Sequence, residues 1–271
     1  MIDNDPNARP QTGLNAADVV YEIVAEFDLT RFLAIYFANA PTNVGSIRST
    51  RPYFAMAMTD YGGGLVHCLD VPGAASILVQ GTTYDYNLCR GSGGEAAIRI
   101  TSRIAPFNLY VNARMLADEL NQHPARSAPA LLARVPLDAS GTSATHIEIN
   151  HPTPHVIIWD WNGSVYLRQQ DGQRHLDANG DQISTDVIVI QRAQEQPTRY
   201  FGEAGYHIVG LTGSGDGTVL AGGGSVKIHW SRAGVTSSTI FVDSAGRPFL
   251  LPPGRVFIEV VSPDAPVTLT S

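Results

Sequence analysis

The stretch Ile2–Phe54 reads IDNDPNARPQTGLNAADVVYEIVAEFDLTRFLAIYFANAPTNVGSIRSTRPYF and is the most informative part of the chain. Short apolar runs alternate here with turn residues, and charged side chains are set among them rather than gathered in one exposed block. Interspersed charges of this kind indicate a binding site or a buried polar network, because a charge taken out of water needs a partner. The stretch therefore predicts strands and a candidate site together.

Regular elements can be placed along the first half of the chain. Residues 29–38 are rich in β-branched and aromatic side chains and predict a buried strand. We expect a short helix over 15–22, because Asn15 is a suitable N-cap. A second helix is predicted from Ser49 or Thr50 to about residue 60, with a proline in its first turn.

Further along, residues 65–69 predict a short strand and residues 73–81 a small helix between glycines. We interpret 84–94 as a loop. The segment 108–112 is compatible with more than one structure, and Asn112 predicts the cap of a following helix.

The second half of the sequence reads almost entirely as strands. Predicted strands cover 145–150, 155–161, 164–170 and 186–193, and Asn-Gly at 162–163 is a favoured hairpin turn. Trp159 and Trp161 share one face of their strand, where core packing is the economical interpretation.

Together these patterns predict an α+β protein. We expect a mixed α/β N-terminal module over 1–124 and a β-rich C-terminal module over 145–271. Between them, residues 125–144 are rich in Pro, Ala and Ser, lack periodicity, and predict a linker.

The amino-acid composition limits the classes of partner that the protein is expected to bind. A net charge of −7 argues against a nucleic-acid groove, which needs a basic surface. Lys227 is the only lysine among 18 basic residues. Codon bias explains an excess of arginine, but clustered arginines are also suited to bidentate binding of carboxylates or phosphates. No span has the roughly 20 apolar residues that cross a bilayer.

The first candidate site is a set of arginines and carboxylates that could converge if strand 29–38 lies beside the turn at 45–51. Two neighbouring carboxylates can act as acid and base, whereas arginines can hold an anion or a sugar hydroxyl. The alternative is a structural ion network. The set consists of Asp3, Arg9, Glu22, Glu26, Arg31, Arg48 and Arg51.

Other candidates add to this set. Ser49 lies among the arginines, His67 could serve as a base or an anion-binding partner, and Asn108 could donate hydrogen bonds. His151 and His155 have a ligand-like spacing, but Thr-Pro between them breaks helical geometry, so we predict no metal site and no cofactor.

The motifs resemble those of the YerB-like bacterial lipoproteins, a family of unknown function, over almost the whole chain. The first half carries IDN (2–4), ARPQ-x-GL (8–14), TRFLAI-x-F (30–37) and GSIRS-x-RPYF (45–54). The second half carries DGQRHLD (171–177) and LLPPGRVFIEVV (250–261). The chain has Phe107-Asn108 where relatives tend to show His-Asn, which moves candidate chemistry away from histidine.

The resemblance implies a protein outside the cytoplasmic membrane, at the bacterial cell surface or in the periplasm. We expect contact with the membrane only through a lipid anchor that lies outside this sequence. Cys68 and Cys89 are either two buried thiols or a disulfide, and this compartment favours the disulfide.

Two functions remain open at this stage. The first is a cell-envelope ligand-binding or scaffold protein that takes a cell-wall glycan, a peptide or another anionic ligand. The second is a cell-envelope hydrolase that acts on a glycan with paired carboxylates from Glu22, Glu26 or Asp3. The binding function is favoured, because the sequence contains no complete catalytic set.

Overall fold

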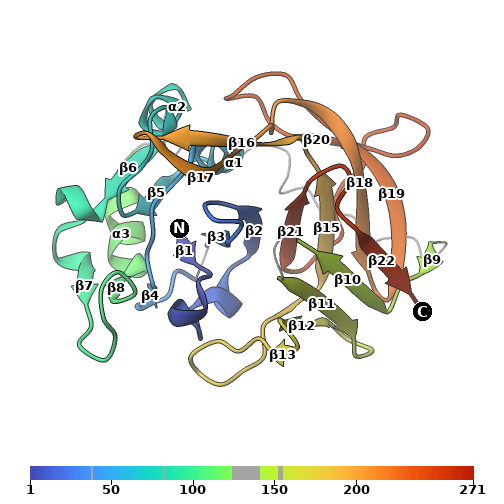
Figure 1. Ribbon diagram of the computed structural model, residues 1–271, viewed down its shortest axis with the longest axis horizontal. Helices are drawn as coiled ribbons and strands as arrows, with labels where there is room; N and C mark the ends of the chain where they lie inside the picture. The colour runs from blue at the N-terminus through green and yellow to red at the C-terminus, as the bar shows by residue number, and fades with distance from the viewer. Residues whose placement is uncertain (38, 82, 124–140, 152–154) are drawn as a thin grey trace.

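The computed structural model describes residues 1–37, 39–81, 83–123, 141–151 and 155–271 of the chain. Within these residues the fold is α+β and rich in strands, as predicted (Figure 1). The α-helices are α1 (Pro52–Met58), α2 (Ala74–Gln80) and α3 (Ala113–Leu120). Single 3-10 turns lie at Pro6–Ala8, Leu14–Ala16, Leu88–Arg90 and Gly94–Ala96.

The largest sheet of the described chain has nine strands. Its order is β1 (Ile2–Asp3), β3 (Thr30–Ile35), β2 (Val19–Val24), β21 (Val256–Val261), β15 (Val187–Arg192), β18 (Gly213–Ala221), β19 (Gly224–Arg232) and β20 (Ile240–Val242), and β9 (Thr142–Ser143) pairs with β19. Strands β2, β21 and β15 run parallel to one another, whereas β2 and β3 form an antiparallel pair.

A second sheet, of six strands, packs against one face of the first. Its order is β13 (Gln173–Arg174), β12 (Tyr166–Gln170), β11 (Val156–Trp161), β10 (His146–Asn150) and β22 (Val267–Thr270), and β14 (Ser184–Thr185) pairs with β12. Three small sheets complete the described structure: β4 (Val44–Gly45), β8 (Leu109–Val111) and β7 (Ala97–Arg99); β5 (Gly64–His67) and β6 (Tyr84–Asn87); β16 (Glu195–Tyr200) and β17 (Glu203–Val209).

The two halves of the sequence share the largest sheet. Strand β2 of the first half lies directly beside β21 of the second, with Val20 opposite Phe257. Most of the predicted linker lies outside the described residues, and its last part contains β9. The division at 125–144 therefore separates two segments of sequence, but the central sheet is built by both.

Two apolar cores fill the faces of this sheet. On one face Tyr53 and Phe54 of α1 and Leu78 of α2 are buried with residues of β2 and β3. On the other face the second sheet contributes Ile147 and Trp159. Each central strand is therefore buried on both sides, as expected for parallel strands.

The predicted helix at 15–22 is wrong. A 3-10 turn ends at Ala16, and Val19–Val24 forms β2, all six residues of which are buried. The run VVYEIV suits a strand buried on both faces, and pairing with β3 and β21 outweighs the local capping signal of Asn15. Similarly, the first four residues of the predicted loop 84–94 form β6, parallel to β5.

Other local predictions are confirmed. Strand β3 lies inside 29–38, and α1 and α2 lie inside the predicted helices, although Arg51 rather than Ser49 or Thr50 occupies the N-cap of α1. The side chain of Asn112 caps α3 by accepting a hydrogen bond from the Met115 amide. The ambiguous segment 108–112 contains β8.

Candidate functional site

The alternation of side chains along β2 and β3 separates the predicted charged residues into two groups. Glu22 and Thr30 meet on the face that packs against the second sheet, whereas Arg31 points to the face that carries α1. We call the first group the buried network and define it as Asn4, Gln11, Glu22, Thr30, Arg168, Gln170, His175 and Glu259. The second group is the arginine cluster of Glu26, Arg31 and Arg51.

Arg168 is the centre of the buried network. Its Nη2 atom lies 2.6 Å from Oε2 of Glu22, and both side chains are inaccessible to solvent. Its Nη1 atom donates to Oε1 of Gln170 at 2.7 Å. The other oxygen of Glu22 accepts from Thr30 at 2.6 Å and from Asn4 at 3.1 Å. Every oxygen of this carboxylate is thus held by a donor.

Glu259 lies next to Glu22 on the neighbouring strand, as the two residues are partners in the pairing of β2 with β21. Its Oε1 atom accepts from the indole nitrogen of Trp159 at 2.8 Å. Burial, reinforced by the adjacent Glu22, raises the pKa of Glu259 well above its usual value. The raised pKa favours the protonated form of Glu259, while Glu22 is the carboxylate that pairs with Arg168.

His175 connects this pair to the amino-terminal segment. Its Nδ1 atom accepts from Nη1 of Arg168, and its Nε2 atom lies 2.6 Å from Oε1 of Gln11. These bonds require the neutral ring with the proton on Nε2. Burial, together with the positive charges of Arg168 and Arg9, lowers the pKa of His175 well below its usual value.

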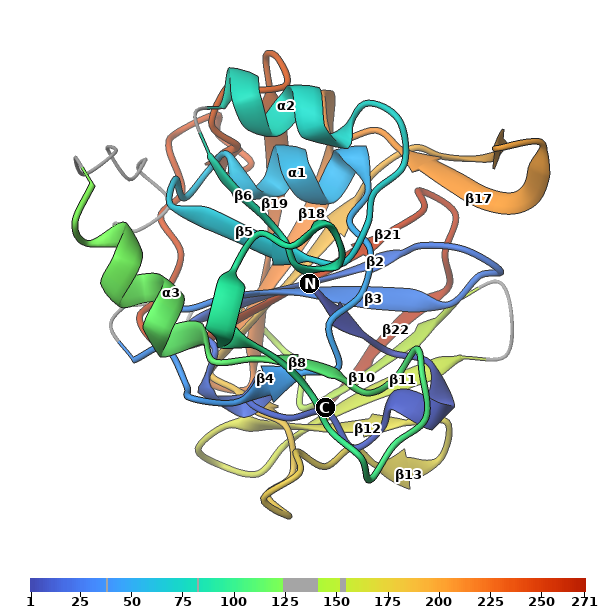
Figure 2. The ribbon, with the colours of Figure 1, turned by 90° about the vertical axis from the view of Figure 1, so that its left-hand side faces the viewer.

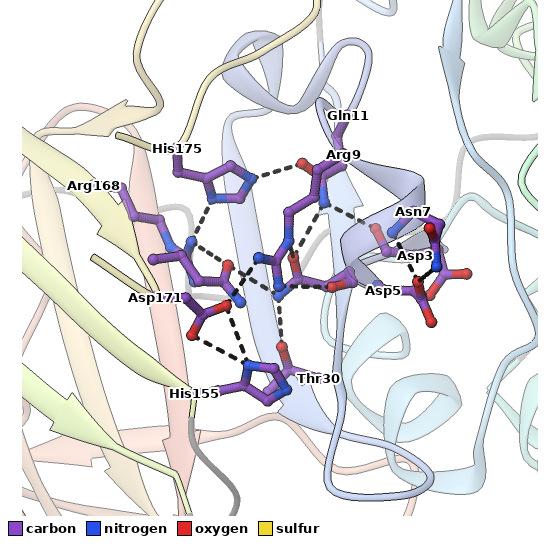
Figure 3. Close-up of polar contacts among 12 residues, drawn as sticks. Asp3, Asp5, Asn7, Arg9, Gln11, Thr30, His155, Arg168, Asp171 and His175 are labelled. Carbon is purple, nitrogen blue, oxygen red and sulfur yellow. Dashed lines mark hydrogen bonds and ion pairs between the residues drawn. The ribbon is translucent and has the colours of Figure 1, made fainter. Parts of the chain in front are cut away.

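The buried network continues to the surface at Arg9 (Figure 3). The Arg9 side chain donates from Nε to Oδ1 of Asn4 at 3.1 Å and pairs from Nη1 with Asp171 at 2.9 Å. Asp171 also lies 3.2 Å from Nδ1 of His155. Burial alone would raise the pKa of Asp171, but the hydrogen bonds from Arg9 and His155 outweigh it and hold the pKa below its usual range.

A cleft of about 350 Å³ opens where this network meets the solvent. We call it the polar cleft. Both halves of the sequence line it, through Arg9, Pro10, Gln170, Asp171, Gln173, Arg174, His175 and Leu176.

Local structure positions the two charged residues at the cleft. Asp171 and Gly172 both have positive φ angles, as in the two-residue hairpin turns that favour Asp-Gly, and this turn places Asp171 at the tip of the β12–β13 hairpin. Arg103 also donates to the carbonyl oxygens of Ala8 and Pro10. The loop that carries Arg9 is therefore held both by Asp171 and by Arg103.

The arginine cluster is arranged differently. Glu26 pairs with Nη2 of Arg31 at 2.5 Å and with Nη2 of Arg51. Burial alone would raise the pKa of Glu26, but the two guanidinium groups outweigh it and lower the pKa. The ring of Tyr206, from the β16–β17 hairpin, lies 5.6 Å from the guanidinium carbon of Arg51. The hairpin, which projects from the body of the molecule in Figure 2, thus contacts the cluster.

The other predicted residues lie near these groups or apart from them. Asp3 pairs with Nε of Arg48 at 3.2 Å, and the backbone oxygen of Ser49 accepts from Arg31. The ring of His67 is buried between Asp85 and the carbonyl oxygen of Leu69, a satisfied structural arrangement.

Two further predictions fall in the region around β5, β6 and β7. Asn108 accepts from Arg99 at the surface, away from the polar cleft. Cys68 and Cys89 form a disulfide with a Cα–Cα separation of 4.9 Å, which ties β5 to the turn after β6.

The structure gives the hydrolase hypothesis little support. Glu22 and Glu26 lie on opposite faces of the sheet, and each is neutralised by arginine. The carboxyl group beside Glu22 is that of Glu259, and both are fully buried rather than facing a cleft. A glycoside hydrolase needs two carboxyl groups on either side of an accessible bond.

Sequence reasoning missed Arg168, Asp171 and His175 as site residues. Asp171 and His175 lie in the segment DGQRHLD, which the family resemblance singles out, and Arg168 lies on the strand just before it. That signal could have found Asp171 and His175. The charge pattern of the first 54 residues could not, because it contains no information about their partners.

Two negative findings apply to the described part of the chain. No group of three or more His, Cys, Asp or Glu side chains is arranged there to hold a metal ion. No helix among the described residues is both long and apolar enough to cross a bilayer.

Fold and site together define a class: an α+β protein of two intertwined segments with a polar cleft between them. The chain belongs to the family described as protein of unknown function (DUF3048), whose N-terminal domain matches residues 1–126 and whose C-terminal domain matches residues 146–258. This confirms the family resemblance seen in the sequence.

One curated relative is the Bacillus subtilis (strain 168) protein named "Putative lipoprotein YerB". It is 27% identical to this chain over 96% of the chain and 80% of the relative. The crystal structure of YerB from Bacillus subtilis superposes with a TM-score of 0.81 at 25% identity and covers 98% of this chain and 91% of that one.

Proposed function

We propose that this protein is an extracytoplasmic binding domain of the cell envelope, whose polar cleft holds an anionic, hydroxyl-bearing group of a cell-wall glycan. The observation that carries the proposal is the excess of positive charge at the cleft within an acidic chain. Among the described residues that line it, Arg9 and Arg174 stand against the single carboxylate of Asp171, while His175 is held neutral. Arginine is well suited to carboxylate and phosphate groups.

The rigidity of the site supports a binding role. Gln170 and His175 line the cleft and also bond to Arg168, which is itself fixed by Glu22. A side chain already held in place loses little conformational entropy when a ligand binds. The cleft is therefore organised before any ligand arrives.

Two observations support a location in the envelope. The curated relative is named as a lipoprotein, and the Cys68–Cys89 disulfide is typical of an oxidising compartment. The relative's name suggests anchoring through lipid.

The test is titration of soluble cell-wall glycan fragments into the protein by calorimetry, with Arg174→Ala as the variant. Arg174 is exposed, and among the described residues its side chain bonds to Gln182, outside the buried network, so its loss leaves that network intact. We expect affinity to fall about tenfold or more, the usual effect of losing a hydrogen bond to a charged group.

Arg247→Ala is the matched control, because Arg247 is exposed and, within the described part of the chain, forms its ion pair locally with Asp243. The affinity of Arg247→Ala for the glycan fragments should equal that of the wild type. Equal loss in both variants, or no binding by the wild type, would contradict the proposal.

A further inference from the structure

The carboxylate of Asp171 occupies Arg9 at the polar cleft, which both residues line. Nε of Arg9 donates to Oδ1 of Asn4 at 3.1 Å, and Nη2 donates to the backbone oxygen of Asn4 at 2.9 Å. Nη1 is bonded to Oδ2 of Asp171 at 2.9 Å. Since Asn4 is buried, it fixes one edge of the guanidinium group inside the protein. Nη1 is left for an anion, and in this structure that anion belongs to the chain itself.

Asp171 has a second partner that does not depend on Arg9. Nδ1 of His155 lies 3.2 Å from each of its carboxylate oxygens, and Figure 3 shows the carboxylate bonded to both residues. The backbone of Asp171 is held separately, because its amide donates to the carbonyl oxygen of Val156 at 2.9 Å. The side chain can therefore leave Arg9 while the turn stays in place and the carboxylate keeps His155.

The pair of Arg9 with Asp171 is exposed enough to be exchanged. Its side chains are 19% and 29% exposed, whereas those of Arg168 and Glu22 are inaccessible to solvent. Water screens an exposed pair, so its net contribution to stability is small. An incoming anion can thus replace Asp171 on Arg9 without disturbing the buried network.

The charge of the cleft favours one class of anion. Among the described residues that line it, Arg9 and Arg174 are opposed by Asp171 and His175 is held neutral, which leaves one positive charge. Asp171 stays beside the cleft when His155 holds it, so a ligand has one positive charge to balance. A carboxylate carries one negative charge, whereas a phosphate monoester carries about −1.5 to −2 at neutral pH. A planar carboxylate also matches the two parallel donors of a guanidinium group.

We propose that Asp171 is an internal competitor for Arg9. The ligand of the polar cleft is a carboxylate carried by a glycan, which binds Arg9 and Arg174 and displaces Asp171. The displaced side chain remains on His155. This inference rests on the proposed function and adds to it the anionic group of the ligand and the residue that limits its affinity. The competition lowers the apparent affinity, since only the molecules with a free Arg9 are ready to bind.

The competition also selects for a ligand larger than a simple anion. A small anion such as acetate gains only Arg9 when it displaces Asp171. A carboxylate carried by a sugar also brings hydroxyl groups to the amides of Gln170 and Gln173, which line the same cleft. Specificity arises because the wrong ligand must break a contact that it does not replace in full.

The experiment is calorimetric titration with a disaccharide that contains one uronic acid, with its methyl ester, and with a sugar phosphate of the same size. Asp171→Asn should bind the uronic acid disaccharide roughly fivefold more tightly than the wild type, because it removes the competing pair. The turn is retained, since Asn-Gly is as suitable there as Asp-Gly. The methyl ester should bind at least about tenfold more weakly than the acid. Tighter binding of the sugar phosphate than of the acid would overturn the assignment of a carboxylate.

Asp5→Asn is the matched control for the change in charge. It removes one negative charge from the loop that carries Arg9, and the new amide still accepts a hydrogen bond from the Asn7 amide, as Asp5 does. Its affinity for the uronic acid disaccharide should equal that of the wild type. An equal gain in Asp5→Asn and Asp171→Asn would show that net charge sets the affinity, and would overturn the proposal.

His155 provides a second test, because it acts through Asp171 and is not among the described residues that line the cleft. His155→Ala removes the alternative partner of the carboxylate, so it should weaken binding of the uronic acid disaccharide by the wild type. In the Asp171→Asn background the same change should have no effect. An equal loss in both backgrounds would show that His155 does not act through Asp171, and would overturn the displacement.

The outcomes separate this inference from the proposed function. A wild-type protein that binds soluble cell-wall glycan fragments but gains no affinity for the uronic acid disaccharide from Asp171→Asn would overturn the competition alone. Failure of both the wild type and Asp171→Asn to bind any of these compounds would overturn the competition and the proposed function together.

Discussion

The buried network and the arginine cluster lie on opposite faces of the same pair of strands, and both combine arginine with glutamate. In the buried network one arginine meets one carboxylate without solvent, and the surrounding amides lead outward to the polar cleft. In the arginine cluster two cations share Glu26 beneath the β16–β17 hairpin. The comparison shows that the role of a charged pair depends on what packs against its face of the sheet. On one face the pair supports the polar cleft, and on the other it contacts the β16–β17 hairpin.

The largest effect is expected from Arg168→Met in the buried network. The change leaves Glu22 buried without its cation, which costs about 3–5 kcal/mol of unfolding free energy. Urea unfolding measures the loss. Arg174→Met, at an exposed position of the same hairpin, should stay within about 0.5 kcal/mol of the wild type. A loss below about 1 kcal/mol for Arg168→Met would show that the network does not hold the fold.

Arg51→Ala in the arginine cluster should cost less, about 1–3 kcal/mol, because Glu26 keeps Arg31 as a partner. The change also removes the contact with Tyr206, so amide exchange in β17 should accelerate. Urea unfolding and hydrogen exchange check the two parts. A loss as large as that of Arg168→Met would remove the distinction between the two regions.

The two regions should respond to pH in opposite ways. In the arginine cluster the folded pKa of Glu26 is lowered, so its contribution to stability is complete above the unfolded pKa of about 4.5 and is lost as pH falls through the folded pKa. Glu26→Gln should therefore flatten the acid side of a plot of melting temperature against pH.

Glu259 in the buried network has a raised folded pKa, so the folded state keeps a proton that the unfolded state releases. Stability then falls as pH rises from about 4.5 toward the folded pKa. Glu259→Gln should remove this fall in stability with rising pH, while the loss of stability at acid pH should remain. Identical plots of melting temperature against pH for Glu26→Gln and Glu259→Gln would contradict the prediction that the two regions respond to pH in opposite ways.

The smallest effect is expected from Arg48→Ala, at most about 1 kcal/mol. Its side chain is 32% exposed, and solvent screens its pairing with Asp3. Urea unfolding should place it nearest the wild type, and a loss comparable to that of Arg51→Ala would assign Arg48 to the arginine cluster.

Local sequence patterns were sufficient for several elements. The dense apolar run of β3, the proline in the first turn of α1 and the cap at Asn112 all act through neighbours a few residues away. The pattern around Asn15 was misleading, because β2 owes its conformation to strands on both sides of it.

The charged residues show the same limit of what local sequence patterns can predict. Their interspersion among apolar residues correctly pointed to partners, but Glu22 meets Arg168 across 146 residues of chain. Nothing in the first half specifies that partner, since it is brought into place by the packing of the second sheet on β2 and β3.

By itself the sequence therefore determined the α+β class, the positions of α1, α2, α3 and several strands, and the importance of its charged first 54 residues. Only the tertiary structure decided which arginine meets which glutamate and which face opens into a cleft. The physical reason is that propensity and periodicity act within a few residues, whereas sheet pairing and face-to-face packing join segments far apart in the chain.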